Sequence, residues 1–239
     1  VSDYTARILP ALLGTVAVVL PYFLRDQLGR LGALFTAVLL AFSPSLLYYS
    51  RFIRNDMFIM VWDLLLVIGM WRFMQHGRRA DLLLAVGALS LAFATKEVTY
   101  LTVVIFGSYL LLTSWRELLP RVFRRFDFRD VSPRAGLLII MGTLSLPLGS
   151  AGAAILWKMV GFAPESTAKL VAGGLVVALL AGLSAFIGWR WNWRYWLAAV
   201  VLFYGIFVVL YTTFFTNLSG LGSGIWGGLD YWLAQQGVQ

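Results

Sequence analysis

Residues 82–115, LLLAVGALSLAFATKEVTYLTVVIFGSYLLLTSW, form a long apolar stretch whose charged residues, Lys96 and Glu97, lie near its middle. A helix that crosses a ~30 Å hydrocarbon core needs about 20 residues, so this stretch is too long for one simple span. At ~1.5 Å per residue, its two apolar parts, 82–95 and 98–115, reach only ~21 and ~27 Å. The stretch is therefore either two short helices that meet near one membrane face, or one long helix with the charged pair at mid-depth.

The composition of the 239 residues places the whole chain in a membrane. Hydrophobic residues make up 60% and charged residues 13%, and the mean hydropathy is +0.82, values that soluble domains of average composition do not approach. The chain has no cysteine, and His76 is its only histidine. Disulfides, thiolate or histidine metal clusters, a cysteine nucleophile and a serine–histidine triad are therefore excluded. We predict an all-α, polytopic transmembrane protein.

Apolar runs and charged breaks predict about eight transmembrane segments, two of them short. They cover residues 8–24, 31–49, 57–74, 82–95, 98–115, 137–157, 170–189 and 195–215. After Thr216 the composition changes, and Ile225, Trp226, Leu229 and Trp232 or Leu233 follow at helical spacing, which predicts a short amphipathic segment on the outer surface. The expected organisation is a transmembrane domain over 1–216 and the start of an outer-face segment over 217–239.

The distribution of basic residues decides between the two arrangements at Lys96. With two helices, 13 of the 19 Lys and Arg side chains share one side, including the six arginines of loop 116–136. Basic residues accumulate on the cytoplasmic side, so we predict two helices and a cytoplasmic loop 116–136. The plasma membrane is the expected location. The net charge of +8 is then an orientation signal, so no nucleic-acid partner is expected, and the loop is expected to contact anionic lipids.

The stretch YYSRFIRNDMFIM, residues 48–60, places two arginines on the opposite, outer face, where an arginine excess is not expected. Arg51 and Arg54 are three residues apart, so their guanidinium groups can face the same way and bind an oxyanion such as a lipid phosphate. The alternative is that both arginines reach up to headgroups while Asn55 or Asp56 caps the next helix. The sequence leaves both interpretations open.

Two carboxylates follow on the third predicted span. Asp56 and Asp63 are seven residues apart and thus project from nearly one face of a helix, with Asp63 ~10 Å deeper. A carboxylate inside a span must pair, bind a cation or take a proton. For Asp63 we favour a structural hydrogen bond to a neighbouring helix.

Lys96 and Glu97 place a third cation beside a carboxylate on the same outer face. If the helices bring the two corners together, the two arginines and Lys96 surround an anion, while Asp56 and Glu97 remain for acid–base or cation-binding work. A local ion pair at a helix turn is the alternative interpretation.

Four patches of the sequence resemble one protein family. SPSLLYYSRFIRNDMFIMVW, residues 43–62, resembles the SRF-x-x-x-D stretch of the dolichyl-phosphate-mannose protein mannosyltransferases, and ATKEVTYLT, residues 94–102, is similar to the lysine-containing stretch that follows it there. DYTARILPALLG, residues 3–14, is similar to the start of that family's second span. With SGIWGGLDYWLAQQGVQ, residues 223–239, the chain is most similar to a bacterial and archaeal branch of flippase-activity-associated, glycosyltransferase-like membrane proteins.

The resemblance implies a glycosyltransferase of the C type (GT-C) that takes a sugar from a polyprenyl-phosphate donor at the outer face, with inversion. It maps the motif arginine to Arg51, the motif aspartate to Asp56 and the lysine to Lys96, whereas Arg54 and Glu97 are departures or features of the branch. The family's first outer loop, with its acidic catalytic pair, is expected before Val1, so Asp56 is the one catalytic candidate here. The resemblance assigns no metal ligands and leaves open whether a divalent metal takes part.

Three functions remain open from the sequence. The first is a transferase that uses a polyprenyl-phosphate sugar, for example in protein glycosylation. The second is a non-catalytic, GT-C-like structural subunit of a larger membrane complex, which the missing acidic loop favours. The third is an accessory to a flippase of lipid-linked glycans; the spans show none of the symmetric repeats that are typical of transporters.

Overall fold

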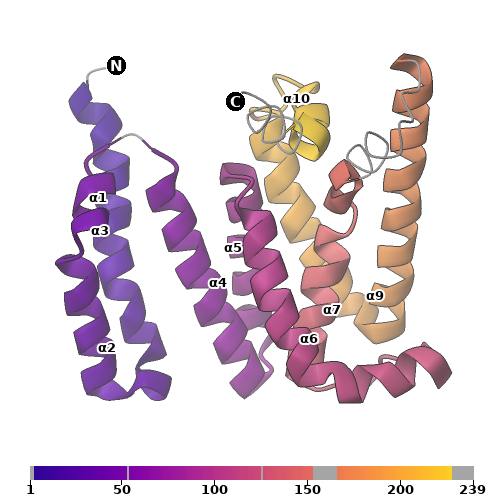
Figure 1. Ribbon diagram of the computed structural model, residues 1–239, viewed down its shortest axis with the longest axis horizontal. Helices are drawn as coiled ribbons and strands as arrows, with labels where there is room; N and C mark the ends of the chain where they lie inside the picture. The colour runs from indigo at the N-terminus through magenta and orange to yellow at the C-terminus, as the bar shows by residue number, and fades with distance from the viewer. Residues whose placement is uncertain (1–2, 53, 125, 153–165, 228–239) are drawn as a thin grey trace, which may run out of the picture. The chain divides into compact units, whose positions relative to one another are not determined.

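The computed structural model describes residues 3–52, 54–124, 126–152 and 166–227 (Figure 1). Helices account for most of these residues, and none of them lies in a strand. This confirms the predicted all-α class. The chain forms two compact units, Val1–Thr99 and Tyr100–Gln239. The expected boundary after Thr216 stays a prediction.

The first unit begins with a helical hairpin whose members lie side by side in Figure 1. Helix α1 (Asp3–Val19) continues into the 3₁₀ helix η1 (Leu20–Leu24), and α2 (Arg25–Ala41) and α3 (Pro44–Tyr49) follow. Inside α2, Gly29 has φ +73°, a value that glycine adopts at little cost, and the helical path breaks there. This break lies between the first two predicted spans.

Helices α4 (Asp56–His76) and α5 (Arg79–Thr95) form a tight antiparallel hairpin in the same unit. Gly77 closes α4 with φ +62°, and its N–H donates to the carbonyl of Phe73 at 2.8 Å, a left-handed cap typical of glycine. Further along, a Cβ atom on Gly69 would lie 2.6 Å from the backbone nitrogen of Ala85. A residue without a side chain is therefore needed where the two backbones approach each other.

Gly69→Ala is expected to destabilise the protein by about 1–3 kcal/mol, because the backbone of α5 would have to move to admit the methyl group. Thermal unfolding in detergent measures this effect. Gly107→Ala in α6 (Thr99–Arg124) is the matched control, because nothing lies within 4 Å of the added Cβ atom there. The control should be neutral or slightly stabilising, since alanine favours helices. Equal melting temperatures for the two variants would contradict the close approach.

The stretch that opened the sequence analysis is not one continuous helix. Helix α5 ends at Thr95 and α6 begins at Thr99. Between them, Lys96 has an extended backbone with φ −161° and ψ 146°. The prediction of two helices that meet at Lys96 and Glu97 is therefore confirmed.

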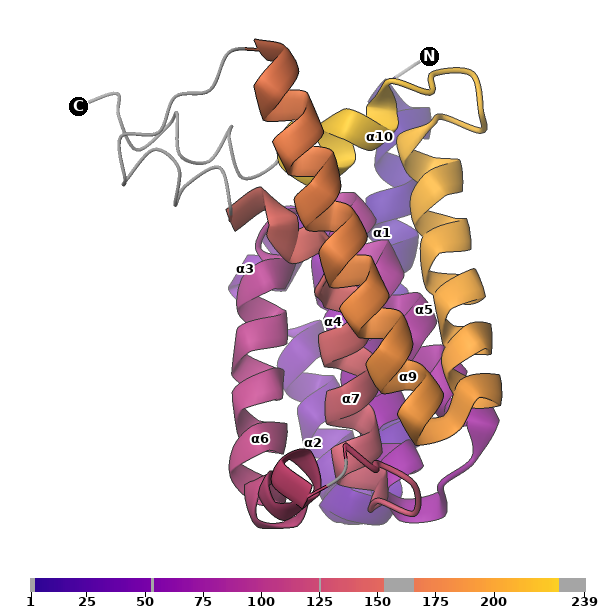
Figure 2. The same ribbon diagram turned by 90° about the vertical axis from the view of Figure 1, so that its right-hand side faces the viewer.

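In the second unit, α6 is followed by α7 (Pro133–Ser145), the 3₁₀ turn η2 (Leu148–Ser150), α9 (Ser166–Tyr211), α10 (Gly220–Gly222) and the π-helical turn η3 (Ser223–Gly227). Figure 2 shows α9 as two arms that reverse direction, and Asn192 leaves helical geometry between them. The arms match the predicted spans 170–189 and 195–215. A Cβ atom on Gly188 would overlap the indole ring of Trp196, so glycine lets the arms meet closely.

Three helical stretches among the described residues are long and apolar enough to cross a membrane: Arg7–Ala41, Asp56–His76 and Val171–Tyr211. The first and the third are broken helices. The third corresponds to two predicted spans, whereas the first covers the span 8–24 and only part of the span 31–49, which is interrupted at Phe42 and Ser43 before α3 begins. Pro133–Ser145 is a shorter apolar helix that begins before the predicted span 137–157, and α5 matches the span 82–95. Helix α6 begins with the predicted span 98–115 but continues to Arg124, so the first part of the predicted loop 116–136 is helical. The chain is a multi-pass membrane protein, while the total of eight spans stays a prediction. Of the predicted outer amphipathic segment, Leu229, Trp232 and Leu233 lie outside the described residues.

Candidate functional site

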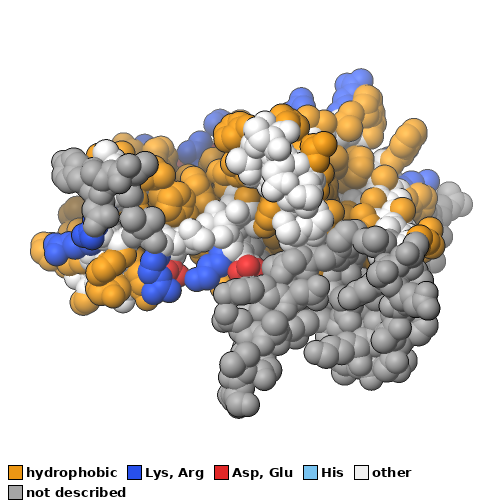
Figure 3. Space-filling view, turned by 90° about the horizontal axis from the view of Figure 1, so that it is seen from above, with side chains coloured by type: hydrophobic (Ala, Val, Ile, Leu, Met, Phe, Trp, Pro, Cys, Tyr) orange, Lys and Arg blue, Asp and Glu red, His pale blue; other side chains and the backbone are white. Residues whose placement is uncertain are grey.

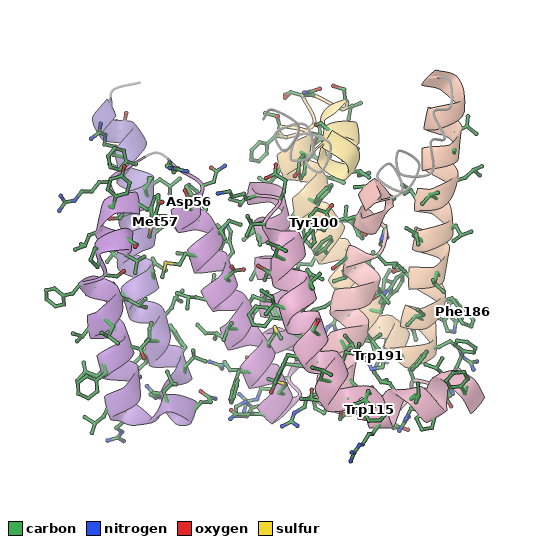
Figure 4. The ribbon with its side chains drawn as sticks, viewed as in Figure 1. Asp56, Met57, Tyr100, Trp115, Phe186 and Trp191 are labelled. Carbon is green, nitrogen blue, oxygen red and sulfur yellow. The ribbon has the colours of Figure 1, made fainter. Side chains whose placement is uncertain are left out.

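The first residue of α4, Asp56, lies between two cations. The ammonium group of Lys96 donates to Oδ1 of Asp56 at 2.9 Å, and Nε of Arg54 lies 3.0 Å from Oδ2. Figure 4 shows Asp56 at this end of α4, and Figure 3, which views the molecule from that end, shows basic side chains next to acidic ones. We call Arg54, Asp56 and Lys96 the Asp56 cluster. Both oxygens of its carboxylate are engaged.

The geometry of the α4–α5 hairpin brings Lys96 to Asp56, which lies 40 residues earlier in the chain. Because the helices are antiparallel, residues progressively closer to the start of α4 face residues progressively closer to the end of α5. The contacts follow this order: Arg72 with Asp81, Gly69 with Ala85, Trp62 with Thr95, and Asp56 with Lys96. The length of the two helices thus determines which residue meets Asp56.

Hydrogen bonds at Thr95 hold the end of α5 next to the start of α4. Trp62 donates from Nε1 to the Thr95 hydroxyl at 3.2 Å, and that hydroxyl donates to the carbonyl of Leu91 at 2.7 Å. Asn55 donates from its side-chain amide to the Thr95 carbonyl at 3.4 Å. Lys96 therefore directly follows a helix end that is held to α4 by Trp62 and Asn55 and to its own helix by the bond to Leu91.

Arg54 has a second partner besides Asp56. Its Cζ atom lies 5.4 Å from the centroid of the Tyr49 ring, which is a cation–π contact. Tyr49 is the last residue of α3, so this contact ties the preceding helix to the cluster. The sequence analysis did not single out Tyr49; the available signal was an aromatic residue just before a turn that contains arginine.

Arg51 and Arg54 do not share a helix, contrary to the geometry that their spacing suggested. Helix α3 ends at Tyr49 and α4 begins at Asp56, so both arginines lie in the connection. Arg51 is exposed, and within the described part of the chain its side chain makes no ion pair or hydrogen bond. The half-buried Glu97 likewise has none among these residues.

Comparison with known proteins places these residues in a family. Residues 1–129, more than half of the chain, match the family model for dolichyl-phosphate-mannose-protein mannosyltransferases. The chain belongs to this family. It contains membrane glycosyltransferases of the C type, which take the sugar from a lipid-linked donor. No curated protein matches the chain, and no solved structure matches it.

In this mannosyltransferase-family chain, the matched range includes the whole Asp56 cluster and Arg51. Asp63, the deeper carboxylate, lies in α4 seven residues after Asp56, and its Oδ1 atom is buried. Its role stays a prediction. Among the residues that the structure describes, no group of three or more Asp, Glu or His side chains is arranged to hold a metal ion.

The same family domain contains a second ion pair, which the sequence analysis missed. Near the other end of the hairpin, Nε of Arg72 lies 2.9 Å from Oδ1 of Asp81, whose side chain is only 7% exposed. The sequence analysis singled out neither residue. The available signal was the pattern of Arg72 before and Asp81 shortly after Gly77, the glycine that closes α4. This pair stabilises the closed end of the hairpin that carries the Asp56 cluster.

Proposed function

We propose that this chain transfers a sugar from a polyprenyl-phosphate-linked donor at the extracytoplasmic face of the plasma membrane. One observation carries the proposal: Asp56, at the start of a helix long and apolar enough to span the membrane, pairs with Lys96 and Arg54 at once, next to the connection that carries Arg51. Three cations against two carboxylates, Asp56 and Glu97, leave an excess of positive charge. A phosphate is the anion that lipids supply at this depth, and arginine binds it with two parallel hydrogen bonds.

The chemistry of the transfer explains why positive charge is needed. The acceptor hydroxyl attacks C1 of the sugar, the bond from C1 to the phosphate oxygen breaks, and C1 inverts. The donor phosphodiester, with one negative charge, becomes a phosphate monoester with up to two. Cations placed where this charge develops lower the barrier, the more so in a site with little water. The hydroxyl proton passes to a base that the described residues do not identify.

The geometry favours a positioning role for Asp56. A general base needs a carboxylate oxygen that is available to accept a proton, whereas Asp56 accepts a hydrogen bond from Lys96 on one oxygen and pairs with Arg54 on the other. Asp56 therefore holds the two cations in place. Lys96 and Arg51 are the proposed phosphate ligands. Arg54 lies between them in the chain and is held by Asp56.

The lipid anchor of the donor supports the location of the site. A polyprenyl chain keeps its phosphate at the membrane interface, where the ends of spanning helices lie, and Asp56 is the first residue of such a helix. The excess of basic residues on the opposite side supports the outer face as the location of the site.

The test is a transfer assay with the full-length protein in liposomes that contain a polyprenyl phosphate carrying a radiolabelled sugar. Lys96→Gln is expected to lower kcat by about 10²-fold, because one cation at the leaving group is lost. Arg30→Gln is the matched control, since Arg30 is an exposed residue of α2 outside the proposed site; its kcat should equal that of the wild type.

Two results would reject the transferase proposal. Movement of the labelled lipid across the bilayer without sugar transfer would favour the flippase accessory. Isolation of the protein from its own membrane only in a stable stoichiometric complex, again without transfer, would favour the structural subunit. The same measurements of sugar transfer and lipid movement also test the proposed membership of the flippase-associated branch.

A further inference from the structure

The C-terminal part of α6 exposes a stripe of large apolar side chains. Trp115, Leu119 and Phe123 are four residues apart and thus lie on one side of the helix, with 46%, 48% and 80% of their surface exposed. Phe126, just beyond the helix, is also exposed. A contiguous apolar surface of this kind indicates contact with lipid or with a partner.

The opposite side of this helical segment packs against the rest of the second unit. Leu118 forms a core cluster with Phe128, Ala135 and Ile139, and the partly buried Val122 packs against it. Figures 1 and 2 show the end of α6 turned across the direction of α7, and Figure 4 labels Trp115 in this part of the unit. Because α7 is an apolar helix and the arms of α9 beside it are long enough to span, a helix that lies across them lies in the plane of the membrane.

Hydrogen bonds connect residues 126–132, which follow the helix, to α6 and α9. The carboxylate of Glu117 accepts hydrogen bonds from the backbone N–H and the hydroxyl of Ser132 at 2.8 and 2.7 Å. Arg121 donates to two loop carbonyls, and Arg190 of α9 donates from Nε to the carbonyl of Phe126 at 2.9 Å. The helix that exposes the apolar stripe is therefore held in place by the residues that follow it and by α9.

Exposed basic residues lie close to the stripe along the chain. Arg116, Arg129 and Arg134 are exposed, and none of them forms an ion pair within the described part of the chain. The Cζ atom of Arg116 lies 5.6 Å from the ring of Trp115, so charge and apolar surface are adjacent. A helix with an apolar face, a tryptophan and flanking arginines matches the interface of a membrane with anionic headgroups.

We propose that residues 115–124 and 126–134, which we call the interfacial anchor, bind the surface of an anionic bilayer. The apolar stripe enters the acyl-chain boundary, and the three exposed arginines lie at the lipid phosphates. This function is independent of sugar transfer. It makes the position of the second unit in the membrane depend on the content of anionic lipid.

Because the natural chain has no cysteine, single cysteines can carry nitroxide labels without background. The test uses Leu119→Cys and Phe123→Cys in the full chain, with Asp127→Cys in the exposed loop as the control, in bilayers of phosphatidylglycerol or of phosphatidylcholine. Accessibility to dissolved oxygen and to a water-soluble nickel chelate gives the depth of each label. At positions 119 and 123 oxygen access should exceed nickel access severalfold, more so in phosphatidylglycerol, and at position 127 the order should be reversed.

Labels at 119 and 123 that lie in water in both bilayers would overturn the proposal. Labels shielded from both reagents would also overturn it, because they would show that a protein covers the stripe. The charge requirement has its own test: the triple variant Arg116→Gln, Arg129→Gln, Arg134→Gln should lose the difference between the two lipids. The control triple Arg25→Gln, Arg30→Gln, Arg78→Gln should keep it. An unchanged difference in the anchor triple would reject the role of anionic lipid.

Discussion

Arg51→Ala is expected to reduce sugar transfer by about 10²- to 10³-fold in kcat while the protein stays folded in the membrane. Arg51 is exposed, and among the described residues no carboxylate depends on it for charge balance. Its removal should therefore cost little stability. In contrast, Arg54 is engaged by both Asp56 and Tyr49. Arg51 thus has the more available guanidinium group for a donor phosphate, and its loss should affect mainly the chemical step.

The measurement is initial transfer rate against donor concentration, with size-exclusion chromatography to show that each variant is folded. Arg51→Lys is the informative companion, because it keeps the charge and loses the planar fork that binds two phosphate oxygens. Its rate should lie between those of the wild type and of Arg51→Ala. Wild-type kcat and KM in a folded Arg51→Ala protein would exclude Arg51 as a phosphate ligand.

The largest effect on stability is expected from Arg72→Met, which should lower the free energy of unfolding by about 3 kcal/mol. The carboxylate of Asp81 is almost fully buried, and Arg72 is its ion-pair partner at 2.9 Å. Without Arg72, a buried charge would remain uncompensated. We expect the lower end of the usual range for a broken buried pair, because the Arg72 side chain is itself 35% exposed and water can enter the space it leaves.

A double variant distinguishes this charge effect from lost packing. Arg72→Met combined with Asp81→Leu removes both charges and should recover most of the lost stability, because an apolar pair can replace a buried ion pair at little cost. Chemical denaturation in detergent micelles gives the two free energies. A double variant that is as unstable as Arg72→Met alone would show that packing, not the unpaired carboxylate, causes the loss.

The sequence predicted most helix positions, because apolar runs and charged interruptions determine where a chain can cross a bilayer. The breaks at Gly29, Lys96 and Asn192 all lie between predicted spans. The sequence placed Lys96 near the two arginines only if the two corners met, and it left Asp56 for acid–base or cation-binding work. The antiparallel hairpin instead brings Lys96 into an ion pair with Asp56.

Other features of the site depend on geometry that spacing does not reveal. By their spacing Arg51 and Arg54 looked equivalent, but the connection between α3 and α4 directs Arg54 to Asp56. The pairing of Arg72 with Asp81 depends on how the chain turns at Gly77. The division into two units at Thr99 had no compositional signal, because apolar residues continue on both sides of it.

The ordered contacts along the α4–α5 hairpin make the position of Lys96 depend on the number of residues in the two helices. Deleting one residue within α5 would turn everything beyond the deletion by about 100° around the helix axis and shift it by about 1.5 Å. Lys96 would then no longer face Asp56, even though every charged residue was still present. The hairpin can therefore accept many changes in the type of its lipid-facing residues, but few in their number.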